Sequence, residues 1–221
     1  MPTTDLIPSA NPASRRLVVV LHGLGDSMAG WRWLPEAMRL PELNYLLVNA
    51  PDDYYGGYSW YDLNGDPGPG VVRSRILLQE LLHSLRERGY PSAETALLGF
   101  SQGCLMTADV GFRYPERLGG LVGISGYVWE PETLLRELSP VAREQRMLFT
   151  HGTRDPLIPC RDVHRQVEAL QAAGLNIEWR EFPKVHTVAG EVELAVIRQF
   201  LTRAMPQPVW DPPSNARRLP L

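Results

Sequence analysis

The sequence has little of several features that define large classes of proteins. Its 221 residues include only 2 cysteines, Cys104 and Cys160, which excludes a disulfide framework and provides no spacing typical of a metal site. The 22 Lys and Arg do not outnumber the 25 Asp and Glu, so the chain lacks the cationic excess typical of proteins that bind nucleic acid. We therefore expect two reduced thiols, no metal and no nucleic-acid partner.

Long apolar segments and internal repeats are also missing. The longest early apolar run, residues 17–21, is far shorter than the roughly 20 residues needed to span a bilayer. The first fifteen residues carry Asp5 and three prolines, where a secretory signal would have a basic start and an apolar middle. These absences predict a soluble, cytoplasmic protein without integral membrane association.

The length of the chain suits one domain, because the core that it can form is large enough for one domain and too small for two. We expect this domain to cover residues 1–205. Residues 206–221 are rich in proline, which cannot continue a helix, and they predict a C-terminal tail that runs over the surface or frays.

Short apolar runs alternate with amphipathic stretches along the chain. Residues 17–21 are continuously apolar, as is typical of a strand buried on both faces of a parallel sheet. Further strands are predicted over residues 45–49, 95–100, 118–124, 147–150 and 177–182. Apolar residues at helical spacing predict helices around residues 71–85, 163–170 and 194–201. This alternation indicates an α/β fold, with a mostly parallel sheet covered by helices on both faces and a site beyond the carboxyl ends of the strands.

The strongest chemical motif is Gly99-Phe100-Ser101-Gln102-Gly103, which lies between a predicted strand and a helical segment that runs to Tyr114. This Gly-x-Ser-x-Gly pattern in a strand-turn-helix context is typical of a nucleophile elbow, in which the serine occupies a sharp, strained turn and exposes its hydroxyl. A similar stretch around Ser125 lacks the final glycine, and we interpret it as a turn at a strand end. Ser101 is therefore the predicted nucleophile.

A serine nucleophile needs a histidine that takes its proton and a carboxylate that orients the histidine. In chain order these groups follow the serine as acid and then histidine. Asp155 lies in a glycine-containing loop after a predicted strand, whereas Asp162 falls at the start of the next helix, where a carboxylate more often serves the helix terminus. His186 follows the last predicted strand, so we predict Asp155 as the acid and His186 as the base.

The other four histidines have different predicted roles. His83 and His164 lie in amphipathic helical patterns, where a solvated side chain is expected. His22 and His151 end predicted strands and precede glycine, so we interpret them as supports of the loops around the site.

Hydrolysis through a serine also needs hydrogen-bond donors for the developing oxyanion. The backbone N–H of Gln102, the residue after the nucleophile, is one such donor, and the loop after residue 21 provides a second, for which we nominate Leu24. The same loop invites a dinucleotide-binding interpretation, but Met28 stands where the third glycine of Gly-x-Gly-x-x-Gly is required. We expect no cofactor.

Aromatic residues concentrate between residues 31 and 61, and much of this window is predicted as loop. Such a loop beside the oxyanion donors can form the wall of an apolar acyl or alcohol site, and Trp60 and Tyr61 are the candidates for substrate binding. Packing of these side chains on the domain's own core is an equally good interpretation.

Four segments, taken together, carry a family resemblance: residues 21–27 (LHGLGDS), 59–62 (SWYD), 99–103 (GFSQG) and 151–159 (HGTRDPLIP). From about residue 17 to residue 201 the chain resembles the carboxylesterases and acyl-protein thioesterases that form the phospholipase/carboxylesterase family of the α/β-hydrolase superfamily. The resemblance implies an α/β-hydrolase fold, the same nucleophile, acid, base and oxyanion donors as above, and a homodimer.

Three functions remain open at this point. The leading hypothesis is a metal-independent serine carboxylesterase that cleaves small-molecule esters of short to medium acyl chains through an acyl-enzyme. The same chemistry on thioesters or lysophospholipids is the alternative. The distant alternative is a hydrolase fold that serves only as a binding module. The complete Ser-Asp-His set in the sequence argues against it.

Overall fold

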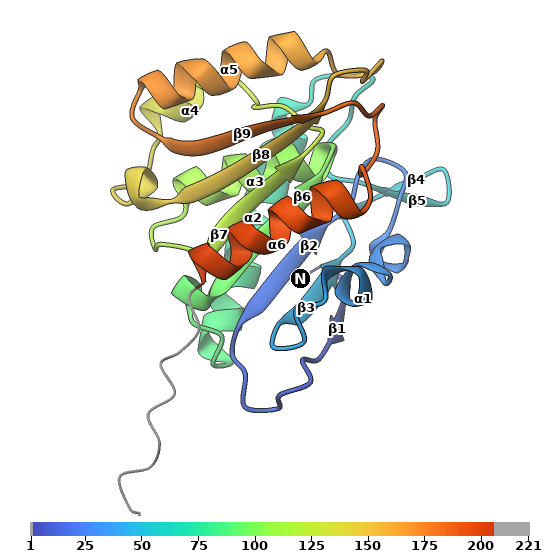
Figure 1. The fold of residues 1–221 in the computed structure, drawn as a ribbon. Coiled ribbons are helices and arrows are strands. Elements are labelled where there is room, and N and C mark those ends of the chain that lie inside the picture. Colours follow the sequence, from blue (N-terminus) through green and yellow to red (C-terminus); the bar gives the residue numbers. More distant parts are fainter. Residues whose placement is uncertain (1, 206–221) are drawn as a thin grey trace, which may run out of the picture.

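A computed structural model describes residues 2–205, and a seven-stranded sheet forms their centre (Figure 1). The strands are β1 (Thr4–Ile7), β2 (Leu17–Leu21), β3 (Asn44–Val48), β6 (Thr95–Phe100), β7 (Gly120–Ile124), β8 (Arg146–Gly152) and β9 (Asn176–Phe182). Their order across the sheet is β1-β3-β2-β6-β7-β8-β9. β1 pairs antiparallel with β3, and all the other neighbours are parallel. The carboxyl ends of six strands therefore point to the same edge.

Six α-helices lie on the two faces of the sheet in the described part of the chain. They are α1 (Leu34–Met38), α2 (Gly68–Glu87), α3 (Gln102–Arg113), α4 (Pro131–Arg136), α5 (Cys160–Ala172) and α6 (Glu191–Ala204). Apolar residues of α2, α3, α4 and α5 form one core cluster with the sheet, and those of α1 and α6 form the other. Figure 1 shows α6 in front of the sheet, with α1 beside it.

Strand β2 shows why the sheet needs a helical layer on each side. Its side chains alternate between the two core clusters, with Leu17, Val19 and Leu21 in one and Val18 and Val20 in the other. All five are buried. A strand that is apolar at every position is stable only when both of its faces are covered, which confirms the predicted fold class.

All six predicted strands are present with small differences at their ends. β8 extends two residues beyond the predicted end at residue 150, and the strand predicted over residues 118–124 begins only at Gly120. The two residues before it form hydrogen bonds outside the sheet ladder: Leu118 N donates to the Gln145 side chain and Gly119 N donates to the Thr95 carbonyl. The predicted helices correspond to α2, α5 and α6, and the segment after Ser101 is α3.

Several elements were not predicted, among them the short helices α1 and α4, an edge strand and a hairpin. The edge strand β1 has only four residues, half of them exposed, so no apolar run marks it in the sequence. The hairpin β4 (Asp52–Tyr54) and β5 (Gly57–Ser59) lies in the window that we interpreted as loop. Its two-residue turn, Tyr55-Gly56, has positive φ values of 46° and 90°, as the tightest hairpin turns require.

Three further expectations concern the composition of the chain. Cys104 and Cys160 are both free thiols, as predicted. Within residues 2–205, no helix combines the length and the apolar character needed to cross a membrane. The predicted tail, residues 206–221, lies outside the described residues.

Candidate active site

Ser101 occupies the sharp turn between β6 and α3. Its φ of 53° and ψ of −114° are a strained combination for a residue with a side chain. The two flanking glycines explain how the turn is built. A Cβ on Gly99 would overlap the carbonyl group of Gly103, and a Cβ on Gly103 would overlap the carbonyl oxygen of Leu21. The start of α3 thus packs directly on backbone, which holds the serine hydroxyl beyond the sheet edge.

The structure brings Ser101, His186 and Asp155 together in one hydrogen-bonded chain. His186 Nε2 lies 2.9 Å from Ser101 Oγ, and His186 Nδ1 lies 2.7 Å from Asp155 Oδ2. Asp155 follows β8 and His186 follows β9, so all three come from loops or turns at the carboxyl edge. In this arrangement the Asp155 carboxylate accepts a hydrogen bond donated by Nδ1–H, which leaves Nε2 free to accept the serine proton.

The Asp155 carboxylate is fixed from two sides. Its Oδ1 accepts hydrogen bonds from the backbone N–H groups of Leu157 at 2.9 Å and Ile158 at 3.0 Å, while Oδ2 faces His186. Burial acts to raise the pKa of Asp155, but the hydrogen bonds from Ile158, His186 and Leu157 outweigh it and hold this pKa below its ordinary value. The group is therefore an ionised acceptor at neutral pH. Asp162, the rejected alternative, is exposed in the first turn of α5 and pairs with Arg165.

A buried ion pair that sequence reasoning missed stabilises the loop that carries His186. Lys184 Nζ lies 2.5 Å from Glu193 Oε1, and both side chains are buried. Burial is the largest influence on Lys184 and lowers its pKa, although Glu193 opposes this. Glu193 Oε2 also accepts from Ala189 N, and the Lys184 carbonyl accepts from Arg154 N at 3.1 Å. The loops that hold Asp155 and His186 are thus tied to each other and to α6.

The predicted oxyanion donors, Leu24 and Gln102, lie close to the predicted nucleophile. Both line the same cavity as Ser101 and His186. Neither backbone N–H takes part in the loop, turn and cap hydrogen bonds formed within residues 2–205, so both remain available to an incoming oxygen.

The side chain of Gln102 turns away from the predicted oxyanion and holds the 59–61 segment. Its Oε1 accepts from Trp60 N at 2.9 Å, and its Nε2 donates to the Tyr61 carbonyl at 2.9 Å. The Ser59 hydroxyl also donates to the Tyr61 carbonyl, at 2.7 Å. One residue therefore combines a predicted catalytic N–H with the support of a cavity wall.

An apolar cavity of about 470 Å³ opens in front of Ser101. Its lining residues are Gly23, Leu24, Asp26, Tyr61, Leu63, Phe100, Ser101, Gln102, Tyr127, Leu157, Ile158 and His186. A larger hollow of about 900 Å³ lies between α2 and the end of α3, but it is open, its rim is charged, and it includes none of the predicted site residues. The cavity at Ser101 is therefore the candidate substrate site.

The two predicted substrate-binding aromatics have different positions. Tyr61 lines the cavity, and its hydroxyl lies 3.2 Å from the Tyr127 hydroxyl. Trp60 is buried in the core and does not line it; its Nε1 donates to the His22 carbonyl at 2.9 Å. The prediction for Trp60 is corrected accordingly: its ring is buried in the core, and its hydrogen bond to the His22 carbonyl supports the loop that follows β2.

The remaining histidines lie as the sequence suggested. His22 is buried and its Nε2 accepts from Ala50 N, and His151 is buried with Nε2 2.9 Å from the Ile158 carbonyl. Burial lowers the pKa of both imidazoles. His83 is exposed on α2, whereas His164 is half-buried on α5, where its ring stacks on Trp179. Among the described residues, no group of three His, Cys, Asp or Glu side chains is placed to hold a metal ion.

The sheet order, the elbow and the site at the carboxyl edge define an α/β-hydrolase. Residues 3–205 match the family model described as Phospholipase/Carboxylesterase, and the chain belongs to this family of hydrolases. Acyl-protein thioesterase 1 of Schizosaccharomyces pombe is 32% identical over 168 residues, covering 70% of this chain and 75% of the relative. The enzyme of the same name from Yarrowia lipolytica is 29% identical over 211 residues, with 87% and 93% covered.

Solved structures agree with this assignment. Esterase PE8 superposes with a TM-score of 0.80 at 28% identity, covering 92% of this chain and 99% of that one. Acyl-protein thioesterase 2 of Zea mays, at 24% identity and with 93% and 100% covered, has a TM-score of 0.77 and supports the fold. The chain is accordingly similar both to esterases and to thioesterases of one family.

Proposed function

We propose that this chain is a serine carboxylesterase that hydrolyses carboxylic esters of short to medium acyl chains, with Ser101, His186 and Asp155 as its catalytic triad. The observation that carries the proposal is the continuous chain of hydrogen bonds from Asp155 through His186 to Ser101, which ends in an apolar cavity. A cavity of about 470 Å³ has room for an acyl chain of modest length.

The reaction follows from the positions of these groups. His186 Nε2 accepts the proton of Ser101 as Oγ bonds to the carbonyl carbon of the ester, and the N–H groups of Leu24 and Gln102 donate to the resulting oxyanion. The oxyanion collapses, the bond to the alcohol breaks, and His186 returns the proton to the departing oxygen. A water molecule then repeats the sequence on the acyl-enzyme, releasing the carboxylic acid and restoring Ser101.

The proposal is tested by covalent labelling with a fluorophosphonate, which reacts with an activated serine. We expect the native protein to be labelled and Ser101→Ala not to be labelled. Ser125→Ala is the matched control, because Ser125 is a buried serine with a positive φ of 50° that also follows a strand. Folded native protein that resists the reagent would contradict the proposal and favour a binding module. Labelling that survives Ser101→Ala would also contradict it, because the reactive serine would then be another residue.

A second candidate is the hydrolysis of thioesters or lysophospholipids by the same groups. It is supported by the relatives, since those from Schizosaccharomyces pombe and Yarrowia lipolytica are both acyl-protein thioesterases by name. Comparison of kcat/KM over matched oxoesters and thioesters of increasing acyl length separates the two candidates. The cytoplasmic location and the homodimer stay predictions, to be checked by cell fractionation and by light scattering.

A further inference from the structure

A second, smaller cavity lies on the other side of His186. It measures about 240 Å³ and is lined by Asp26, Gly30, Trp31, Trp33, Phe100, His186, Thr187 and Val188. Three of these residues, Asp26, Phe100 and His186, also line the cavity in front of Ser101. The two cavities therefore meet at the histidine that serves both steps of the proposed reaction.

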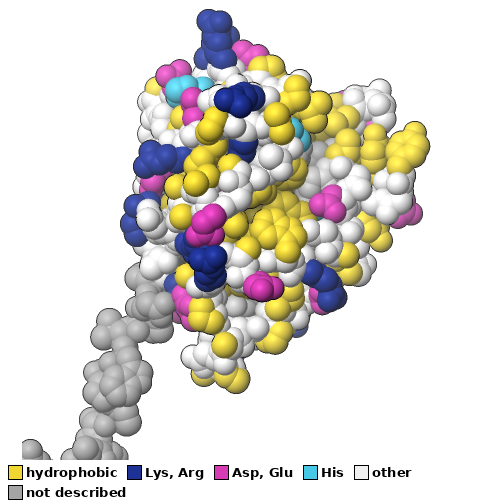
Figure 2. All heavy atoms as spheres, turned by 45° about the vertical axis from the view of Figure 1, so that its right-hand side comes forward, with side chains coloured by type: hydrophobic (Ala, Val, Ile, Leu, Met, Phe, Trp, Pro, Cys, Tyr) yellow, Lys and Arg dark blue, Asp and Glu magenta, His cyan; other side chains and the backbone are white. Residues whose placement is uncertain are grey.

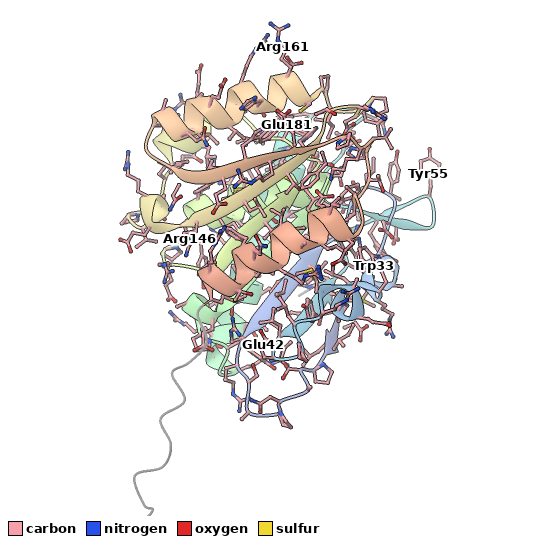
Figure 3. The ribbon with its side chains drawn as sticks, viewed as in Figure 1. Trp33, Glu42, Tyr55, Arg146, Arg161 and Glu181 are labelled. Carbon is pink, nitrogen blue, oxygen red and sulfur yellow. The ribbon has the colours of Figure 1, made fainter. Side chains whose placement is uncertain are left out.

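Aromatic rings form one wall of the second cavity. Phe100 lies 5.0 Å from the His186 ring, Trp31 lies 5.9 Å from Phe100, and Trp33 stacks on Trp31 at 5.8 Å, all between ring centroids. Trp31 is buried, whereas 43% of Trp33 is exposed. Figure 3 shows Trp33 near α1, and Figure 2 shows hydrophobic side chains gathered in the middle of this face. Part of the Trp33 side chain is thus exposed next to the site.

The charge on this cavity is negative. Asp26 is its carboxylate, and no Lys or Arg is among the lining residues of the described chain. Asp26 is held in place because Oδ2 accepts from Trp31 Nε1 at 3.1 Å and Oδ1 accepts from Ser27 N at 2.7 Å. Arg32, the cation nearest in sequence, forms an ion pair with Asp5 at 2.7 Å. A carboxylate beside exposed indole is an arrangement that attracts a cation.

We propose that this second cavity receives the leaving group of the substrate and favours an alcohol or thiol that carries a positively charged nitrogen close to the scissile bond. The inference rests on the proposed function. His186 must protonate the departing atom, so the leaving group has to lie on the histidine side of Ser101 while the acyl chain occupies the apolar cavity. The Trp33 ring then faces the cation, and Asp26 adds a Coulomb attraction.

The test compares two esters of nearly the same shape, butyrylcholine and 3,3-dimethylbutyl butyrate, which differ in a quaternary nitrogen against a quaternary carbon. A cation–π contact of about 1 kcal/mol corresponds to roughly a fivefold higher kcat/KM for the cationic ester. Trp33→Leu should lower the ratio to the part that Asp26 alone contributes, and Trp33→Phe should keep more of the preference. Tyr55→Ala, which removes an exposed aromatic at the hairpin tip, is the matched control and should leave the ratio unchanged.

Two results would overturn the inference: a native ratio of one or less, or a preference that persists undiminished in Trp33→Leu. Fluorophosphonate labelling separates this failure from failure of the proposed function. A labelled protein that cleaves the neutral ester without charge preference refutes only the leaving-group cavity. An unlabelled protein refutes the serine mechanism as well.

Discussion

Replacement of Asp155 by Asn tests the orientation of His186 with almost no change in shape. In the native site Oδ1 accepts two backbone N–H bonds, from Leu157 and Ile158, and Oδ2 faces His186 Nδ1. An asparagine keeps the two backbone bonds only if its oxygen takes the Oδ1 position. Its NH₂ group then faces Nδ1, which must give up its proton to accept the new hydrogen bond. The proton moves to Nε2, where it points at Ser101 and prevents that nitrogen from accepting the serine proton.

We therefore expect Asp155→Asn to fold like the native protein and to lose roughly 10,000-fold in kcat, the effect of the same tautomer error in serine proteases. Steady-state hydrolysis of a chromogenic ester measures the loss, and circular dichroism checks the fold. Asp162→Asn is the matched control, since that carboxylate lies seven residues further on at the exposed start of α5. A loss of less than tenfold for Asp155→Asn, or an equal loss for Asp162→Asn, would refute the assigned role.

The remaining predictions concern stability. Gly103→Ala places a Cβ against the backbone carbonyl of strand β2 and should lower the free energy of unfolding by about 3 kcal/mol, measured by urea denaturation; a neutral result would mean that α3 can move away. Glu193→Gln leaves the buried Lys184 ammonium without its counter-charge and should cost about 3–5 kcal/mol, and a change below 1 kcal/mol would contradict the ion pair's structural role. Since burial lowers the pKa of His22 and His151, the unfolded chain binds protons that the native state excludes, so Tm should fall as pH drops below about 6.5; a Tm that stays flat to pH 5 would argue against their burial as neutral rings.

The core of the fold was accessible from sequence because its signals are local. Strand β2 is apolar at all five positions, and such a run has few alternatives to a covered parallel strand. The elbow was equally clear, since two glycines flank a serine where a strand gives way to a helix. The positions of Asp155 and His186 then followed from chain order and from the rule that loops after parallel strands meet at one edge.

What the sequence could not reveal depends on contacts between distant residues. Trp60 and Tyr61 are adjacent buried aromatic residues, yet only Tyr61 lines the cavity. Their partners are distant in sequence: Trp60 Nε1 donates to the His22 carbonyl, and the Tyr61 hydroxyl faces that of Tyr127. From the sequence alone, Lys184 would be taken for an exposed surface lysine. In the fold it is buried and forms an ion pair with Glu193 on α6. The hairpin turn at Tyr55 was missed because a positive φ on a tyrosine is not a common turn signal.

Gln102 combines the support of a cavity wall with the proposed donation to the oxyanion, and this limits how selectivity can be changed. A redesign that enlarges the cavity in front of Ser101 by moving residues 59–61 would pull on the Gln102 side chain and so displace its backbone N–H, the proposed oxyanion donor. Wider selectivity would then be accompanied by slower turnover. Leu63 and Leu157 line the same cavity, and both side chains are exposed at its rim. Selectivity for long or branched acyl chains is therefore best engineered at these two rim positions, where side-chain volume can change without disturbing the oxyanion donor.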